Sequence, residues 1–229
     1  MTNPAASALR AATTSFNVLG PVTVEHSGVS APLGGPRQVA VLARLLIGVG
    51  QVVTMDQLVE AVWDGAGPSQ PEVTIRSYLS NLRRAIEPER SRGGRNSCIE
   101  SCSPGYRLAV DPIRIDAHRF EAEVERGRAA LAAGDGDTCV DLLERALDRW
   151  RGGPYDGVLE TAAVVGVRAR LEERRLVAVE SLAEARLARG EHEAVMPLLE
   201  AGGAALDARV APAPGAFGLD GPSQIREVA

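Results

Sequence analysis

The chain contains no lysine, and all 25 of its basic residues are arginines. The absence of lysine is typical of a GC-rich genome and indicates no particular chemistry. Aromatic residues make up only 3% of the 229 positions. A hydrophobic core must therefore be built mainly from leucine, valine and alanine, and the 45% hydrophobic content is enough for one large or two small globular domains.

Long apolar runs are also missing. No segment approaches the roughly 18 consecutive apolar residues of a membrane-spanning helix. The first fifteen residues, MTNPAASALRAATTS, lack the apolar centre of a signal peptide. We therefore expect a cytoplasmic protein that does not contact a membrane.

Cysteines are few, and their role is open. Cys98, Cys102 and Cys139 are too few for a disulfide framework. Cys98 and Cys102 could form a redox pair or half of a metal site, but the second half of such a site is missing. The alternative is that they are small residues of a strand and a turn.

Motifs of enzymes are absent as well. The three histidines (His26, His118 and His192) are scattered, and no paired carboxylates or metal-ligand spacing stand out. Gly34 and Gly35 are not followed by the Lys-Ser/Thr pair of a phosphate-binding loop. The sequence therefore predicts no enzymatic activity, no cofactor and no metal ion.

The net charge of −5 hides an asymmetry between the two halves. Residues 1–110 contain 10 arginines and 8 acids, a balance of +2, whereas residues 111–229 contain 15 arginines and 22 acids, a balance of −7. A mildly basic half joined to an acidic half suggests two separate tasks, one of them directed at an anion.

Elements in the first half follow a recognisable order. Residues 1–15 read as a disordered leader, and residues 16–33 as short antiparallel strands. Pro36 opens a helix; a second begins with a predicted Thr54/Gln57 capping box and a third with a predicted Ser69/Glu72 box. Residues 98–110 read as a β-hairpin. Strands, three helices and a hairpin are the order of a winged helix-turn-helix, assigned here to residues 16–111.

The third helix, residues 74–88, has two unlike faces. Ile75, Leu79, Leu82 and Ile86 form an apolar stripe at spacings of 4, 3 and 4, which is one buried helix face. The opposite face has cations and hydrogen-bonding groups but no acid, as expected of a helix that reads DNA. It carries Thr74, Arg76, Ser77, Tyr78, Ser80, Asn81, Arg83 and Arg84.

The second half is predicted to be all-α. Residues 131–144 (LAAGDGDTCVDLLE) match residues 187–200 (LARGEHEAVMPLLE) at an offset of 56. Each copy reads as helix, glycine-acid turn and helix, the unit of a tetratricopeptide-like stack. We assign residues 112–200 to this partial helical domain. Residues 201–229, where alanine, glycine and proline occupy 16 of 29 positions, read as a disordered tail.

These segments together resemble the actinomycete antibiotic regulatory proteins (SARP family), which join an OmpR-type winged helix to a bacterial transcriptional activation domain. The resemblance covers roughly residues 16–200. It rests on the order and spacing of residues 19–46 and 52–65, of TIRSYLSNLRRAIEP and SPGYRLAV, and of the helical segments 116–135, 142–157 and 168–192. It implies an α+β winged helix followed by an all-α domain, in an activator of a secondary-metabolite gene cluster.

The resemblance also implies partners and site residues. The partners are double-stranded DNA with promoter direct repeats, RNA polymerase and a second copy of the chain on DNA. Ser77, Asn81 and Arg76 would lie toward bases, with Ser80 on the same face, and Thr74, Tyr78, Arg83 and Arg84 toward phosphates. Ser103 and Arg107 belong to the wing. The polymerase-contact loop would comprise Asp64, Gly65, Ala66, Gly67, Pro68 and Ser69.

Two departures from the family pattern leave alternatives open. Cys102 stands where relatives usually have a wing arginine, with Ser103 in place of glycine, and the activation domain is predicted to be incomplete after residue 200. A truncated relative that competes for the same sites as a repressor is one alternative. A protein-interaction module that binds no DNA is the other.

Overall fold

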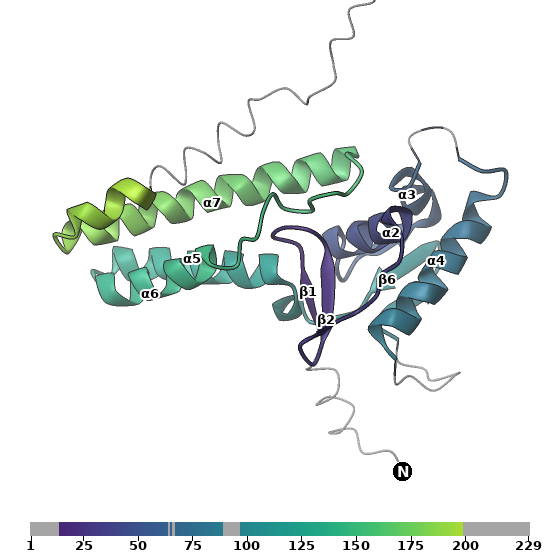
Figure 1. Ribbon diagram of the computed structural model, residues 1–229, viewed down its shortest axis with the longest axis horizontal. Helices are drawn as coiled ribbons and strands as arrows, with labels where there is room; N and C mark the ends of the chain where they lie inside the picture. The colour runs from purple at the N-terminus through teal and green to yellow at the C-terminus, as the bar shows by residue number, and fades with distance from the viewer. Residues whose placement is uncertain (1–13, 64, 66, 89–96, 199–229) are drawn as a thin grey trace, which may run out of the picture.

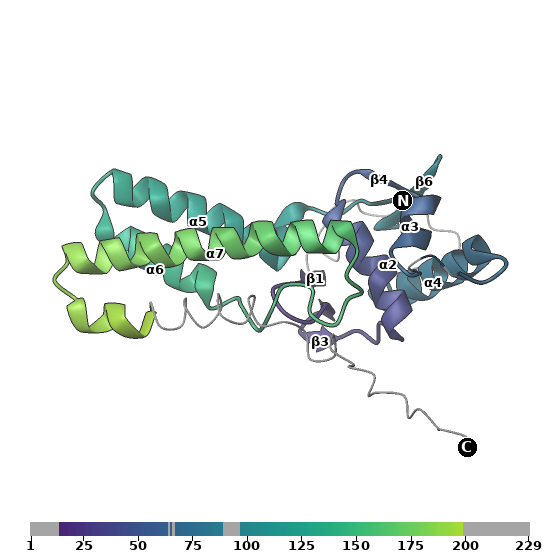
Figure 2. The same cartoon turned by 90° about the horizontal axis from the view of Figure 1, so that it is seen from above.

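Three groups of elements follow one another along the chain in the computed structural model, which describes residues 14–63, 65, 67–88 and 97–198 (Figure 1). A small N-terminal sheet lies between a winged-helix unit and a unit of longer helices (Figure 1). The view turned by 90° shows the same order (Figure 2). In both views the long helix α7 extends from the far end of the helical unit back to the winged helix.

The N-terminal sheet is antiparallel, in the order β1-β2-β3. Its strands are β1 (Thr14–Asn17), β2 (Thr23–His26) and β3 (Val29–Ser30). Phe16 lies opposite Val24 and both are buried, whereas Ser15 and Glu25 form a pair on the outer face. Thr14 and Ser15 therefore belong to β1. The predicted C-terminal boundary of the disordered leader, residue 15, is wrong by these two residues. The rest of the leader, residues 1–13, lies outside the described residues.

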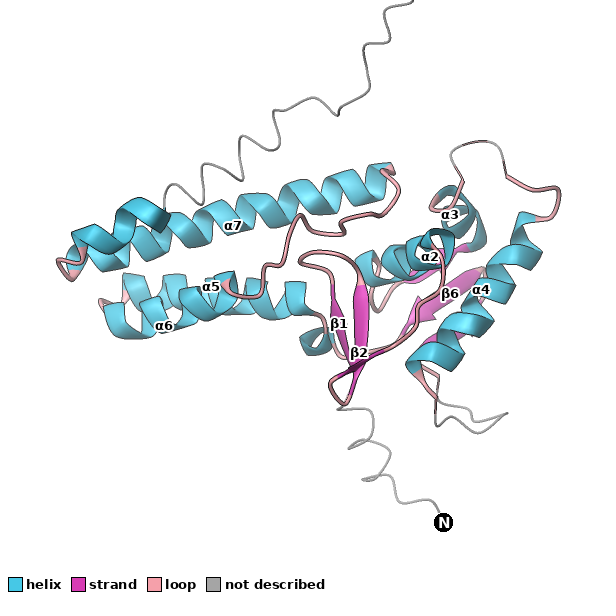
Figure 3. Ribbon diagram, viewed as in Figure 1, coloured by secondary structure: helices cyan, strands magenta, loops and turns pink. Residues whose placement is uncertain are grey.

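The winged-helix unit has the predicted helices and hairpin (Figure 3). Its elements are α2 (Pro36–Ile47), β4 (Val52–Thr54), α3 (Met55–Glu60), α4 (Pro71–Ile86), β5 (Ile99–Cys102) and β6 (Gly105–Leu108). The predicted apolar stripe, Ile75, Leu79, Leu82 and Ile86, is the buried set of α4. The strand β4, which the sequence analysis missed, pairs with β6 in a sheet of order β4-β6-β5.

The two predicted capping boxes have different outcomes. At α3 the Gln57 backbone N–H donates to Thr54 Oγ1 (3.3 Å), and the Thr54 N–H donates to Gln57 Oε1 (3.1 Å), which confirms the first box. The Ser69/Glu72 box is wrong, because α4 begins at Pro71 with Gln70 as its N-cap and no side chain caps it. Ser69 therefore lies one residue outside the N-cap.

The helical unit contains the predicted repeat. Its elements are the short 3₁₀ helix η1 (Pro112–Arg114), α5 (Asp116–Ala132), α6 (Gly136–Leu147), α7 (Ala162–Ala188) and helical residues 192–198. These elements and the winged helix confirm the predicted fold class. Among the described residues, no helix is both long and apolar enough to cross a bilayer.

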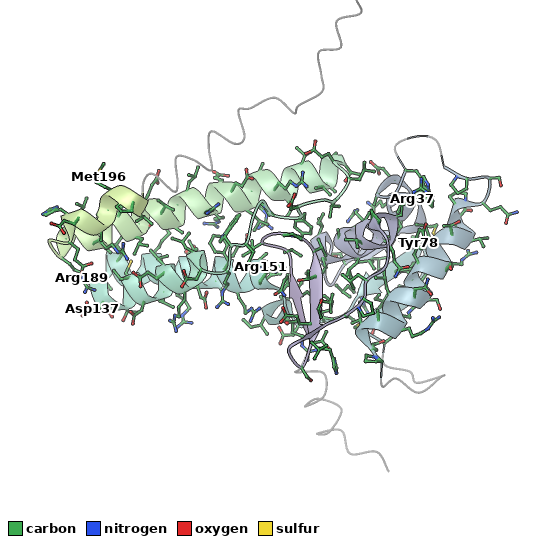
Figure 4. All side chains as sticks on the ribbon, viewed as in Figure 1. Arg37, Tyr78, Asp137, Arg151, Arg189 and Met196 are labelled. Carbon is green, nitrogen blue, oxygen red and sulfur yellow. The ribbon has the colours of Figure 1, made fainter. Side chains whose placement is uncertain are left out.

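The two glycine-acid turns have similar backbone conformations and equivalent backbone hydrogen bonds. Gly134 and Gly190 have φ angles of 79° and 77°, a left-handed conformation that favours glycine. Asp135 N–H bonds to the Ala130 carbonyl (2.9 Å), and 56 positions on Glu191 N–H bonds to the Arg186 carbonyl (2.9 Å). The turns are also joined to each other, because Arg189 donates to Asp137 at 2.6 Å (Figure 4).

A buried carboxylate joins the N-terminal sheet to the helical unit. Asp116, the first residue of α5, accepts hydrogen bonds from the backbone N–H groups of Val18 (2.7 Å) and Leu19 (3.2 Å) and from the Arg151 guanidinium (2.9 Å). Burial raises the pKa of Asp116, and the backbone N–H groups and Arg151 oppose that shift. Three segments distant in sequence therefore meet at one side chain.

The hydrophobic core is continuous through this junction. One cluster includes Phe16 of β1, Leu42 of α2, Phe120 of α5 and Leu171 of α7. Residues 16–30, which were predicted to belong to the winged-helix domain, thus also pack on the helical unit. A boundary at residue 111 describes the order of elements, but the two units share one core.

We expect Asp116→Ala to lower the free energy of unfolding by roughly 2–4 kcal/mol, because it leaves two buried backbone N–H groups without acceptors and removes the partner of Arg151. Urea denaturation followed by circular dichroism measures this. Asp141→Ala, an exposed acid on α6, is the control and should stay within about 0.5 kcal/mol of the native chain. Equal stability of the two variants would contradict the role assigned to Asp116.

Candidate nucleic-acid interface

The outer face of α4 carries an exposed stripe of cations and hydroxyl groups. Arg76, Ser77, Ser80 and Arg84, hereafter the exposed stripe, are all exposed. Positions 76, 80 and 84 are four residues apart and so follow one line along the helix. Among the described residues, neither Arg76 nor Arg84 forms an ion pair. The stripe therefore presents two arginines to solvent that form no ion pair with a described residue.

Two other predicted residues lie at the edge of this face. Thr74 and Tyr78 are half-buried, and Tyr78 packs against the hydrophobic core (Figure 4). The Tyr78 ring therefore fixes the helix on the core while its rim stays accessible. These two positions flank the exposed stripe and are not part of it.

The Asn81 side chain forms a hydrogen bond within the protein. Its Nδ2 donates to Gln38 Oε1 at 3.3 Å, and the buried Gln38 amide donates in turn to the Leu33 carbonyl at 2.8 Å. This chain of bonds connects α4 to the start of α2. Turning Asn81 toward a base would leave the Gln38 oxygen without this donor, which is unfavourable at a buried site.

Arg83 holds α4 to the wing. Its Nε donates to the Ile99 carbonyl (2.9 Å) and its Nη2 to Ser101 Oγ (3.2 Å), while the guanidinium lies 5.6 Å from the centre of the Tyr106 ring. Cation–π contact and hydrogen bonds together orient the side chain toward β5 and β6. The geometry thus gives Arg83 a structural role in addition to its positive charge.

The wing itself has little free charge. Arg107 faces Glu100 across the β5–β6 ladder and bonds to it at 2.5 Å, which raises the pKa of the guanidinium. Ser103 is exposed at the turn. No residue with a side chain fits at position 105 in place of Gly105, because an added Cβ would lie 1.9 Å from the Val53 carbonyl oxygen of β4. Of the predicted wing residues, only Ser103 offers an uncommitted polar group.

The predicted polymerase-contact loop joins α3 to α4 at the surface (Figure 3). Gly65, Gly67, Pro68 and Ser69 are exposed, and Asp64 and Ala66 lie outside the described residues. The loop follows Trp63, whose ring is covered by the exposed Arg37 at 6.0 Å.

Val73 is a surface residue that the sequence analysis missed. It is 55% exposed and lies one turn before the exposed stripe, at spacings of three and four from Arg76 and Ser77. The sequence does indicate that Val73 is exposed, because this residue does not fall on the buried Ile75–Leu79–Leu82 stripe. An exposed apolar side chain beside cations is suited to contact a thymine methyl group in the major groove.

The two cysteines near the wing lie apart. Cys102 ends β5 and Cys98 immediately precedes it, so three residues lie between them and the four extended steps span about 13 Å. Burial beside Glu87 raises the pKa of the Cys98 thiol. A redox pair is therefore wrong for these residues. Among the described residues, no cluster of three or more His, Cys, Asp or Glu side chains is placed to hold a metal ion.

Comparison with known families gives a match on each unit. The family described as "transcriptional regulatory protein, C terminal" matches residues 32–108, which run from the start of α2 to the end of β6. The bacterial transcriptional activator domain matches residues 115–209, which begin at α5. The regulatory protein DnrI of Streptomyces peucetius is 33% identical over 191 residues, which are 81% of this chain and 70% of DnrI. The chain belongs to the SARP family of transcriptional regulators.

Other relatives of this SARP chain are longer. The transcriptional regulatory protein MoaR1 of Mycobacterium tuberculosis is 40% identical over 187 residues, covering 81% of this chain and 59% of MoaR1. The chain therefore spans less than two thirds of that relative. The structure of M. tuberculosis EmbR, solved with a low-affinity phosphopeptide, superimposes with a TM-score of 0.76 at 34% identity, over 82% of this chain and 49% of EmbR.

Membership of the SARP family confirms the predicted fold and places the chain among relatives that are named as regulators of transcription. The family match to residues 32–108 contains the whole of α4 and the wing. The exposed stripe is therefore part of the unit that defines the regulatory protein family.

We expect Arg83→Ala to lower the free energy of unfolding by roughly 1–3 kcal/mol, since it removes two hydrogen bonds and a cation–π contact between α4 and the wing. Arg84→Ala, its neighbour in sequence, makes none of these contacts and should change stability by less than about 0.5 kcal/mol. Thermal unfolding of the two variants compares them directly. A larger loss for Arg84→Ala would show that the α4–wing contact has been misassigned.

Proposed function

We propose that this SARP chain is a sequence-specific DNA-binding regulator that activates a secondary-metabolite gene cluster. It binds promoter direct repeats through α4 and contacts RNA polymerase through the loop of residues 64–69. The protein then acts in the cytoplasm, where promoter DNA is accessible. The observation that carries this proposal is the exposed stripe: unpaired cations and hydroxyl groups on a helix that is fixed on its other sides.

The chemistry of the stripe fits the major groove. An α-helix fits into that groove, where arginine can donate two hydrogen bonds to guanine and serine can bond to several base edges. Arg76, Ser77 and Ser80 occupy the middle of α4 and are assigned to base contacts, while Arg84 in the last turn is assigned to a phosphate. Val73 adds an apolar contact to a thymine methyl group.

Asn81 and Arg83 contribute to DNA binding mainly by holding the helix in place. Asn81 joins α4 to α2, and Arg83 joins it to the wing. A helix held from two directions loses little further freedom on binding, so less of its interaction energy is lost to ordering. Because Arg107 is paired with Glu100, the wing contributes mostly through Ser103.

A second copy on the adjacent repeat supports stable binding. One α4 presents only a few side chains to base edges, so a single half-site supplies limited discrimination. Two chains on neighbouring repeats double the phosphate contacts and the number of bases read. Footprinting at saturation should therefore protect both half-sites of a selected promoter fragment.

Arg76→Ala should weaken binding to a fragment selected from genomic DNA by roughly tenfold or more and should relax preference at one base position. Arg84→Ala should weaken binding to all sequences similarly. It should also reduce the slope of the logarithm of the binding constant against the logarithm of the salt concentration by about one. Fluorescence anisotropy across a salt series measures both. The control is Arg126→Ala, an exposed arginine on α5, which removes the same charge far from α4. Equal losses in all three variants would indicate a nonspecific charge effect and contradict the proposal.

Replacing Pro68 and Ser69 by alanine should leave DNA affinity unchanged and reduce promoter-dependent transcription in vitro. The reason is that both residues are exposed on the loop before α4 and lie outside the stripe in the sequence. Run-off transcription with purified polymerase provides the measurement. Glu60→Ala, an exposed substitution at the end of α3, is the control. Unchanged transcription by the loop variant would show that this loop does not contact the polymerase. Repression of transcription by the native chain would favour the alternative of a repressor that competes for the same DNA sites.

A further inference from the structure

A polar cavity of about 570 Å³ lies where the N-terminal sheet meets the helical unit. Its volume is within the usual range of small-molecule sites. The β1–β2 sheet forms one wall, and the start of α5, the end of α6 and the loop after α6 form the other. Figure 4 places Arg151 in this region, between the helices and β1. The helices α5 and α6, which contribute to the cavity lining, lie on the opposite side of the N-terminal sheet from α4 (Figure 1).

Four arginines from three segments converge on this cavity: Arg119 of α5, Arg145 of α6, and Arg149 and Arg151 of the following loop. They do so in the half of the chain that has a net charge of −7 by count of its residues. The cavity lining therefore has four arginines against three acids, Glu25, Asp116 and Asp148. Such a concentration of guanidinium groups is unfavourable unless acids or a bound anion compensate it.

Two of these arginines already have acidic partners. Arg149 bonds to Glu123 at 2.6 and 2.9 Å, and Arg151 bonds to Asp116 at 2.9 Å. These pairs fix the cavity wall and belong to the fold. They leave Arg119 and Arg145 as the groups available to a ligand.

Arg119 and Arg145 have no acidic partner among the described residues. The Nε of Arg119 is buried and finds no hydrogen-bond acceptor. A buried unpaired donor on a charged group is costly, and such groups are normally satisfied by a partner. Arg145 donates only to the Asp141 carbonyl, from its Nε at 3.0 Å, so its terminal nitrogens remain available.

The opposite wall offers hydrogen-bond acceptors and donors. Ser15 and Asn17 alternate with buried Phe16 along β1 and so face the cavity together. Glu25 lies opposite Ser15 on β2 and accepts a bond from Asn17 at 3.2 Å. Asp148 at the end of α6 completes the lining as an acid without an ion pair among the described residues.

We propose that this cavity, hereafter the junction cavity, binds a small molecule that carries a phosphate or carboxylate group together with hydroxyl or amino groups. The oxyanion contacts Arg119 and Arg145, and the hydroxyl or amino groups contact Glu25 and Asp148. Phosphate and carboxylate each present two oxygen atoms that can accept two parallel hydrogen bonds from the planar guanidinium group. Because the two walls come from different units, a bound ligand would stabilise their junction.

The test uses the full chain and two probes, pyrophosphate and citrate, in isothermal titration and thermal-unfolding experiments. We expect saturable binding of at least one probe with a dissociation constant of about 1 mM or tighter, and a rise in the unfolding temperature. The probe that binds distinguishes a phosphate-bearing ligand from a carboxylate-bearing one. Arg119→Ala and Arg145→Ala should each weaken binding roughly tenfold while leaving the fold intact by circular dichroism.

Two controls separate this site from the rest of the molecule. Arg126→Ala removes an exposed arginine from the same helix as Arg119 and should bind the probe normally. Arg84→Ala removes a cation of the exposed stripe, so a loss of probe binding only in this variant would place the anion on α4 and overturn the proposal. Absence of binding by both probes, or equal losses in Arg126→Ala and Arg119→Ala, would overturn it too. None of these measurements depends on DNA binding.

Discussion

The Asp116 carboxylate is the interaction on which the arrangement of the chain depends. It is buried at the first residue of α5, and it accepts hydrogen bonds from two backbone N–H groups after β1 and from Arg151 after α6. A buried charge is tolerated only when it is paired and hydrogen-bonded, so the three segments must meet at this point. The winged helix is then held against the helical unit by a shared core, and α4 faces away from that junction (Figure 1).

The helix α4 shows how one short element divides its side chains between the core, neighbouring elements and solvent. Ile75, Leu79 and Leu82 are buried, and Asn81 and Arg83 bond to α2 and to the wing. What remains on the outer face is a narrow set of unpaired polar and cationic groups. Because the polar residues at the flanks hold the helix in place, the outer groups are presented to solvent in a defined orientation. DNA recognition in this proposal therefore rests on fewer residues than the polar composition of α4 suggests.

The net charge of residues 111–229 does not predict how charged side chains are distributed over that half of the chain. Its balance of −7 predicts an acidic surface, yet four arginines gather at one cavity beside the N-terminal sheet. Two of them are structural, since Arg149 and Arg151 neutralise buried or half-buried acids. The other two, Arg119 and Arg145, lie 26 positions apart in sequence, on the separate helices α5 and α6. Their common location appears once α5 and α6 fold back on each other at Gly134.

Periodicity within single elements was readable from the sequence alone. The buried face of α4, the Thr54/Gln57 cap, the hairpin and the repeat of the Gly134 and Gly190 turns were all predicted, because each depends on residues within one or two helical turns. Contacts between distant segments were decided by the tertiary structure. These include the pairing of β4 with β6, the bond from Asn81 to Gln38 across 43 residues and that from Val18 to Asp116 across 98. Spacing along a chain specifies which face a side chain occupies, whereas its partner depends on which other face is packed against it.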